Sequence, residues 1–220
     1  MERALHRRFK EVIRIISTIA SRGGASSNRV HRLRTETRRA DAALRLFVDY
    51  LSRPRFKSIR KRLAVIRRVA GAVRDLDVLK PLLKETVVLS HVESQWLLNR
   101  ICALRAKRVK VLRSRCIRYL EGEQRSKVRS LIHKIRRKKN GIANAEFMSD
   151  GGVLDQLVTE FSEAVDRLNC EIGSVHRVRI LARRLRYTLE FLSERSSDAA
   201  IDASCRFLAI LQETLGAACD

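Results

Sequence analysis

The chain repeats itself at a fixed offset, and this repeat limits the folds that are open to it. The segment VHRLR at Val30–Arg34 recurs as VHRVR at Val175–Arg179, 145 positions later. At the same offset, and without a gap, the match extends over about residues 9–75 of the first copy. An ungapped match of this length indicates two copies of one structural unit.

Mostly apolar residues recur every three or four positions in both copies, which is the period of an α-helix that packs on one face. In the first copy these residues are Val30, Leu33, Thr37, Ala40, Leu44, Phe47 and Leu51, and in the second they are Val175, Val178, Ala182, Leu185, Leu189 and Leu192. Two prolines and nine glycines leave few points at which helices can break. We therefore predict an all-α fold of two antiparallel helical bundles, related by pseudo-twofold symmetry, with a shortened second copy.

The repeat also predicts the organisation of the chain. Residues 1–220 are expected to form a single domain, made of an N-terminal helical half, residues 1–145, and a C-terminal helical half, residues 150–220. Counterparts of residues 76–139 would lie beyond the last residue, so the second copy is either naturally shorter or truncated, and we expect truncation.

Glycines, prolines and polar runs predict where single helices begin and end. Gly151–Gly152 is predicted to separate the two copies, and Pro54 and Pro81 to mark places where helices stop or start. Between the copies, the pattern predicts a long amphipathic helix over about residues 91–120 and a basic helix over about residues 125–138.

Positive charge is concentrated in the first two thirds of the chain, whose overall formal net charge is +23. Residues 1–150 hold 39 Lys and Arg against 13 Asp and Glu, whereas residues 151–220 hold 8 against 11. Such an excess repels itself in a compact state, and a polyanionic partner relieves that repulsion. No apolar run reaches the length of a membrane span and no secretory leader is visible, so we expect a cytoplasmic protein that does not bind membranes.

Histidine and arginine share one face of each predicted repeat helix. His31, Arg34, Arg38 and Arg45 are separated by three, four and seven positions, which places them on one side of a helix, beside the core stripe. In the second copy, His176, Arg179, Arg183 and Arg186 follow a similar pattern. Guanidinium groups bind phosphate oxygens bidentately, and a row of them matches an extended phosphate chain.

These residues resemble the paired motifs of CHAD domains, the conserved histidine α-helical domains. The resemblance lies in VHRLRTETRRADAALRLF and VHRVRILARRLRYTLEFL, and in Ala70–Val78, which is similar to the family segment L-G-x-x-R-D-x-D-V. Leu211–Gly216 resembles the second-half equivalent of that segment. The chain departs from the family pattern at Ala70 and at Asp41–Ala42.

The resemblance covers nearly the whole chain. It implies a non-enzymatic domain of two helical bundles whose basic face or channel binds inorganic polyphosphate, often at polyphosphate granules. The helix pattern and the resemblance together give these candidate polyphosphate-binding residues: His31, Arg34, Arg38, Arg39, Arg45, Arg74, His176, Arg179, Arg183, Arg184 and Arg186. Asp75 and Asp77 are interpreted as structural, either as a cap of the next helix or as partners of these arginines.

Other functions remain open at this point. A nucleic-acid-binding protein without sequence specificity would use the same charge, although few aromatic residues are present to stack on bases. A phosphohistidine or metal-binding protein is a weaker alternative, because the spacings typical of a metal site are absent from the sequence. We expect no catalytic residue, no bound metal and no cofactor, and the sequence does not predict an oligomeric state.

Overall fold

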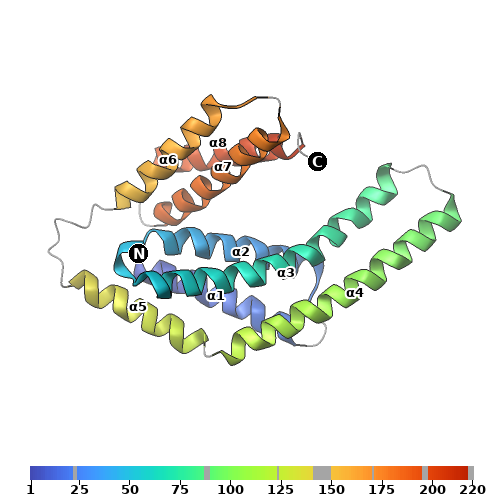
Figure 1. Cartoon of the computed structure of the whole chain (residues 1–220), viewed down its shortest axis with the longest axis horizontal. Coiled ribbons are helices and arrows are strands. Elements are labelled where there is room, and N and C mark those ends of the chain that lie inside the picture. Colours follow the sequence, from blue (N-terminus) through green and yellow to red (C-terminus); the bar gives the residue numbers. More distant parts are fainter. Residues whose placement is uncertain are drawn as a thin grey trace. The chain divides into compact units, whose positions relative to one another are not determined.

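The computed structural model describes residues 1–21, 24–86, 90–122, 124–140, 150–169, 171–194 and 198–217. These residues form α-helices and one short 3-10 helix, with no strand among them, so the predicted all-α fold is confirmed (Figure 1). The helices are α1 (Glu2–Ala20), α2 (Ser27–Arg45), η1 (Val48–Tyr50), α3 (Arg53–Thr86), α4 (His91–Glu121), α5 (Gln124–Asn140), α6 (Asp150–Asp166), α7 (Ile172–Ser193) and α8 (Ala199–Ala217).

The helix boundaries reproduce the repeat found in the sequence. Helices α2 and α7 begin at Ser27 and Ile172, which are separated by the same 145 positions as the two motifs. Helices α3 and α8 begin at Arg53 and Ala199, one residue away from that offset. The first copy therefore corresponds to α1–α3 and the second to α6–α8.

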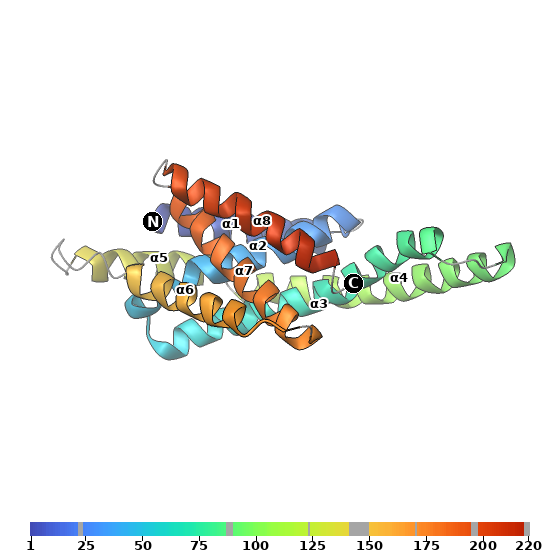
Figure 2. The ribbon, with the colours of Figure 1, turned by 90° about the horizontal axis from the view of Figure 1, so that it is seen from above.

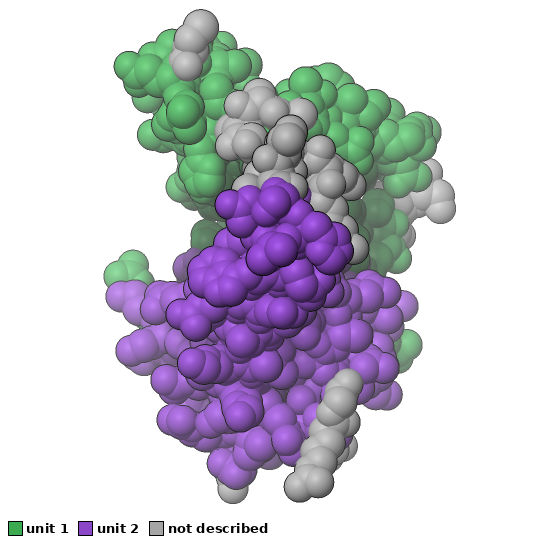
Figure 3. Space-filling view, turned by 90° about the vertical axis from the view of Figure 1, so that its right-hand side faces the viewer, with its two compact units in different colours: residues 1–5, 38–53, 132–220 green, residues 6–37, 54–131 purple. Residues whose placement is uncertain are grey.

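The chain divides into two compact units, which Figure 3 shows in different colours. Unit 1 contains Met1–Leu5, Arg38–Arg53 and Ile132–Asp220, and unit 2 contains His6–Thr37 and Pro54–Leu131. The division falls inside α2, so the first motif helix contributes its N-terminal half to unit 2 and its C-terminal half to unit 1.

Unit 2 has a core of fully buried apolar side chains from α1, α2, α3, α4 and α5. Its largest members are Phe9, Ile16, Ile19, Leu33, Leu63, Leu112 and Leu131. Helix α4 begins with a capping box: the Ser90 hydroxyl accepts a bond from the Glu93 amide, and the Glu93 carboxylate accepts one from the Ser90 amide. The long helix predicted over about residues 91–120 is therefore confirmed.

Unit 1 is centred on α7, which contacts both α6 and α8. Figure 2 shows α7 lying between these two helices. Their shared core consists of Leu157, Ala164, Val178, Leu181, Ala182, Leu185, Leu189 and Leu208. Residues that follow α2 join the same unit, because the Phe47 ring lies edge-on to the Phe191 ring at 6.3 Å between centroids.

Two predicted breaks are absent. Pro54 is the second residue of α3, as predicted, but Pro81 lies inside α3 instead of ending it. The turn before Pro81 is held from outside, because the Arg105 guanidinium of α4 donates to the Asp77 carboxylate at 2.5 Å. This contact helps to offset the backbone hydrogen bond that a proline removes.

Gly151–Gly152 was predicted to separate the copies, and this is also wrong, because α6 already begins at Asp150. The first N–H groups of a helix have no partner within the helix, so two glycines at this position cost less than they would in its middle. A Cβ added at Gly152 would meet nothing within 4 Å.

Candidate polyanion-binding site

The first arginine of the α2 motif packs against a glycine of α3. A Cβ at Gly71 would lie 3.8 Å from the Arg34 guanidinium carbon, within ordinary contact distance. One turn further along α3, the Asp75 carboxylate lies 3.6 Å from the same guanidinium. Arg74 donates from Nη1 to the hydroxyl of Ser27 at 3.1 Å, at the first residue of α2. These contacts place two candidate arginines of unit 2 on one side of the α2–α3 pair.

The same arginine–glycine contact recurs in unit 1 at the repeat offset. Arg179 of α7 packs against Gly216 of α8, where a Cβ would approach the guanidinium Nη2 to 3.3 Å. Arg34 and Arg179 are equivalent positions, and so are Gly71 and Gly216. Each glycine gives an arginine room to lie close to the third helix of its copy.

A second cluster joins the C-terminal half of α2 to α7 within unit 1. The Arg39 guanidinium lies 5.6 Å from the centre of the Tyr187 ring, and the Arg186 guanidinium lies 5.1 Å from it. Arg39 donates from Nε to the Glu190 carboxylate at 3.0 Å, and Arg186 Nε lies 3.6 Å from the other oxygen of that carboxylate. Two candidate arginines therefore share one aromatic ring and one acid.

One ion pair has its charges exchanged between the copies. In α2, Arg45 pairs with Asp41 at 3.4 Å, one helical turn away. At the equivalent positions of α7, Glu190 takes the place of the arginine and Arg186 that of the aspartate. Both copies therefore keep an ion pair between residues four positions apart, but the order of the acid and the arginine along the helix is reversed.

Three of the candidate arginines hold a buried N–H group that donates to no hydrogen-bond acceptor in the described part of the chain. These groups are the Nε atoms of Arg34, Arg184 and Arg186. Arg184 does donate from Nη1 to Glu160 of α6 at 3.2 Å. An unpaired buried donor costs about 1–3 kcal/mol, and such groups are typical of sites that a bound ion or water completes.

The two motif histidines and the remaining arginines lie on accessible parts of the same helices. His31 and His176 are exposed, and Arg38 and Arg183 are half-buried. The structure places His31, Arg34 and Arg74 in unit 2, and it places in unit 1 the candidates Arg38, Arg39, Arg45, His176, Arg179, Arg183, Arg184 and Arg186.

The chain matches the family model of the CHAD domain over residues 5–220. It belongs to the CHAD domain family. Among solved structures, the chain is similar to the CHAD domain from the plant Ricinus communis, with a TM-score of 0.68 and 22% sequence identity. That likeness covers 98% of this chain and 73% of the plant chain, and it shows the fold. The search of curated proteins found no match.

The acidic partners of this CHAD domain's arginines were only partly predictable. The two alternatives for Asp75 are now separated: pairing with Arg34 is confirmed, and capping is wrong because Asp75 lies inside the continuous helix α3. The pairing of Arg186 with Glu190 could have been found from their spacing of four residues. The Arg184–Glu160 contact had no such signal, because it joins two helices.

Among the described residues of the CHAD domain, no helix is both long and apolar enough to cross a membrane. Among the same residues, no group of three or more His, Cys, Asp and Glu side chains is placed to hold a metal ion.

Proposed function

We propose that this CHAD domain binds inorganic polyphosphate without catalysing a reaction, and that the arginine-rich sides of α2 and α7 make the contacts. The observation that carries the proposal is the recurrence of one arrangement at the repeat offset. In each copy an arginine lies against a glycine, at Arg34 and at Arg179, and an exposed histidine precedes it by one turn. A feature kept twice in otherwise divergent copies favours a role in binding over a role in packing.

The chemistry of these groups suits a phosphate chain. Guanidinium groups make charge-assisted, often bidentate, hydrogen bonds to phosphate oxygens. The buried Nε donors of Arg34 and Arg184, which have no hydrogen-bond acceptor among the described residues, favour a ligand that supplies acceptor oxygens. The net charge of +23 adds a long-range attraction for any polyanion, and this attraction weakens as salt is added.

Binding measured against phosphate chain length tests the proposal. Labelled polyphosphates of short, intermediate and long chain length are titrated with the protein at several salt concentrations. Affinity is expected to rise with chain length, because a longer chain reaches more guanidinium groups at once. The matched controls are Arg14→Gln and Arg167→Gln, which remove exposed arginines outside the motif helices. Affinity that does not change with chain length would contradict the proposal.

The absence of catalysis is tested in the same samples. Phosphate release from polyphosphate is expected to stay at the rate measured without protein, and no acid-labile phosphate should form on His31 or His176. Turnover above that rate, or a phosphorylated histidine at saturation, would replace the binding proposal by an enzymatic one.

A second candidate function is nucleic-acid binding without sequence specificity. It is favoured by a row of exposed cations on α4, at Arg100, Lys107 and Arg118, whose spacings of seven and eleven residues place them on one helix side. Competition separates the two functions. Long-chain polyphosphate should displace DNA at low molar excess, and Lys107→Gln with Arg118→Gln should weaken DNA binding and leave polyphosphate binding unchanged.

A further inference from the structure

Helix α4 exposes one continuous side along most of its length. Its buried residues are Ile101, Leu112, Cys116 and Tyr119. On the opposite side, exposed residues follow one another in steps of three or four positions: Trp96, Arg100, Ala103, Lys107, Lys110, Ser114 and Arg118. Such steps place them in one row along the helix. We call these seven residues the α4 outer face.

The arginines that fix α4 in unit 2 lie outside this row. Figure 1 shows α4 lying along α3, and Arg108 donates from Nη1 to the carbonyl of Ala72 in α3 at 2.7 Å. Arg113 donates from Nε to the carbonyl of Ala20 in α1 at 2.7 Å. These contacts hold the helix from its inner side. The outer face is therefore not needed to attach α4 to its neighbours.

The α4 outer face is positive along its whole length. Four of its seven residues are Lys or Arg and none is acidic, while the two acids of α4, Glu93 and Glu121, lie near the ends of the helix. Within the described part of the chain, Arg100, Lys107 and Lys110 pair with no carboxylate. From Trp96 to Arg118 the row spans roughly 33 Å, given the rise per residue of an α-helix. A row of this length attracts an extended polyanion.

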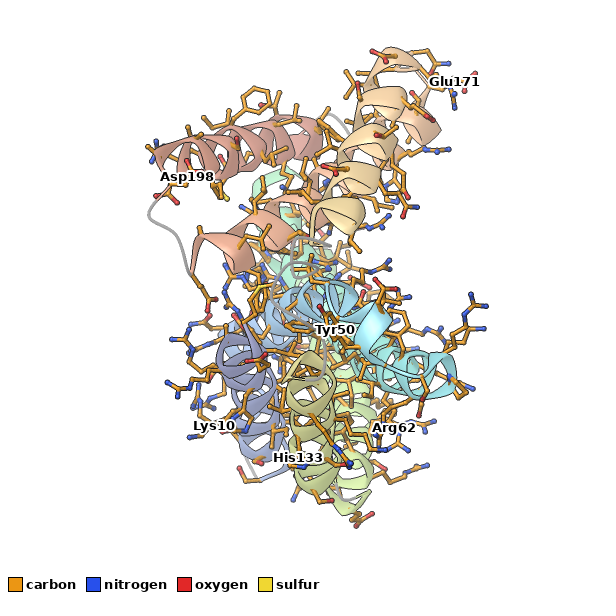
Figure 4. The ribbon with its side chains drawn as sticks, turned by 90° about the vertical axis from the view of Figure 1, so that its left-hand side faces the viewer. Lys10, Tyr50, Arg62, His133, Glu171 and Asp198 are labelled. Atoms are coloured by element: carbon orange, nitrogen blue, oxygen red, sulfur yellow. The ribbon has the colours of Figure 1, made fainter. Side chains whose placement is uncertain are left out.

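Trp96 distinguishes this row from the other basic surfaces. Its side chain is 65% exposed, and it is the single tryptophan of the chain. Among the described residues one other Phe, Tyr or Trp ring is exposed, that of Phe207, and it lies on α8 with two acids and one arginine. Lys10 of α1 is an exposed cation as well (Figure 4), but α1 exposes no aromatic ring. The α4 outer face is thus the place where an exposed ring and a row of cations coincide.

An exposed indole beside a row of cations fits a polyanion that also carries planar bases. Proteins that hold single strands stack bases on aromatic rings and bind the backbone phosphates with cations. In a duplex each base is already stacked and paired, so a base must leave the double helix before it can lie on Trp96. Inorganic polyphosphate has no bases, so it can bind the cations but gains nothing from the ring.

We propose that the α4 outer face binds single-stranded nucleic acid, with one base stacked on Trp96 and backbone phosphates on Arg100, Lys107 and Arg118. This inference rests on the second candidate function and narrows it from nucleic acids in general to single strands. It uses no residue of the α2 and α7 motifs, so it is independent of the proposed polyphosphate binding.

The single tryptophan allows a direct test, because the intrinsic tryptophan fluorescence of the full chain comes from Trp96 alone. The chain is titrated at one salt concentration with an unlabelled oligothymidine strand, with the duplex of that strand and its complement, and with long-chain polyphosphate. We expect the single strand to quench the fluorescence, because a stacked base lies against the indole ring. The duplex and the polyphosphate are expected to leave it nearly unchanged.

The affinity of the same strand, labelled and followed by fluorescence anisotropy, tests the contribution of the ring. Trp96→Leu is expected to weaken binding about 10-fold, which is in the range measured for one base stacked on an aromatic ring. The matched control is Val92→Ala, one turn before Trp96, where the side chain is 77% exposed. This variant should bind the strand as the wild type does. Circular dichroism of both variants shows whether their helices are retained.

Four outcomes would overturn the proposal. Binding without quenching, or an equal affinity of the wild type and Trp96→Leu, would place the strand elsewhere and leave nucleic-acid binding itself intact. A duplex that binds and quenches as well as the single strand would contradict the preference for single strands. Equal losses in Trp96→Leu and Val92→Ala would assign the contact to general apolar burial. A chain that binds neither strand nor duplex would remove the second candidate function as well, and polyphosphate binding would stand or fall on its own measurement.

Discussion

The two copies of the repeat share one arginine–glycine contact but differ in the charge of the helix that supplies the glycine. In both, an arginine of the middle helix packs against a glycine of the third helix, at Arg34 with Gly71 and at Arg179 with Gly216. The third helices themselves differ sharply in charge: α3 carries eleven Lys and Arg against three acids, and α8 carries one against two. A duplicated unit that loses its surface charge but retains this contact indicates that the position of the guanidinium is the constrained feature.

The largest expected difference between the copies is in stability. Leu63→Ala in α3 and Leu208→Ala in α8 each remove a leucine that is almost fully buried. We expect Leu63→Ala to lower the free energy of unfolding by about 4 kcal/mol and Leu208→Ala by about 2 kcal/mol, because the second copy can collapse around the cavity more easily. Urea denaturation measures both. Equal losses would show that the copies are packed equally well.

The next largest effect concerns polyphosphate affinity. Arg34→Gln and Arg179→Gln each replace one guanidinium by a shorter, uncharged amide. We expect each single variant to lose about 10-fold in affinity and the double variant about 100-fold, since a hydrogen bond to a charged group contributes about 1.5–3 kcal/mol. Fluorescence anisotropy with long-chain polyphosphate gives the three values. A double variant no weaker than either single variant would mean that the copies do not act together.

Alkaline pH should affect unit 2 more than unit 1. Burial raises the pKa of Cys116 to about 12 and that of Tyr119 to about 12, and both groups belong to α4. In the unfolded chain these groups lose their protons near pH 9 and pH 10, so the unfolded state binds fewer protons and stability falls as the pH rises toward 12. The expected loss is about 1 kcal/mol per pH unit for each group.

Cys116→Ala with Tyr119→Phe should remove that part of the alkaline dependence. The measurement is urea denaturation between pH 8 and pH 11, with the variant compared against the wild type so that titrating lysines cancel. Identical slopes in the two proteins would show that neither group is ionised on unfolding in this range.

The smallest expected effect tests the shared glycine contact. Gly71→Ala should raise the free energy of unfolding by about 0.5–1 kcal/mol, because alanine favours a helix and the new Cβ lies at an ordinary contact distance from Arg34. Gly216→Ala should gain less, because its Cβ would approach Arg179 to 3.3 Å and displace the guanidinium. Thermal unfolding and polyphosphate binding are measured on both variants. A loss of polyphosphate affinity in Gly71→Ala, without a loss in Gly216→Ala, would show that the contact with Arg34 tolerates a Cβ less well than the contact with Arg179.

Much of the fold was predictable because helical periodicity is a local property. The apolar series of the first motif, from Val30 to Leu51, is buried throughout, although α2 ends at Arg45 and Phe47 and Leu51 lie beyond it. The helix predicted between residues 91 and 120 is present. Pro81 was misjudged because the contact from Arg105 that helps to hold its turn comes from another helix. Local rules for proline contain no information about such a contact.

The candidate site, like the fold, was predictable where it depends on one helix and not where it depends on contacts between helices. The spacing of histidine and arginine predicted a common helix side, which depends only on the helix itself. Some of the carboxylates that pair with the arginines come from other helices, as in Arg184 with Glu160 and Arg34 with Asp75, and the local sequence does not predict these pairs. The buried acid Glu36, which lies 3.7 Å from Arg8, was missed for the same reason.

Under the proposed polyphosphate binding, Glu190 would make the cluster around Tyr187 selective among phosphate ligands. One carboxylate serves both Arg39 and Arg186, so it already occupies the place that an anionic ligand would take. A ligand must outcompete this internal anion, and a single small phosphate would exchange one ion pair for another with little gain. A polymer that contacts several guanidinium groups at once offsets the free energy lost when Glu190 is displaced, because its contacts act together. Glu190 would thereby set a threshold of charge density, below which common cellular phosphates leave the cluster undisturbed.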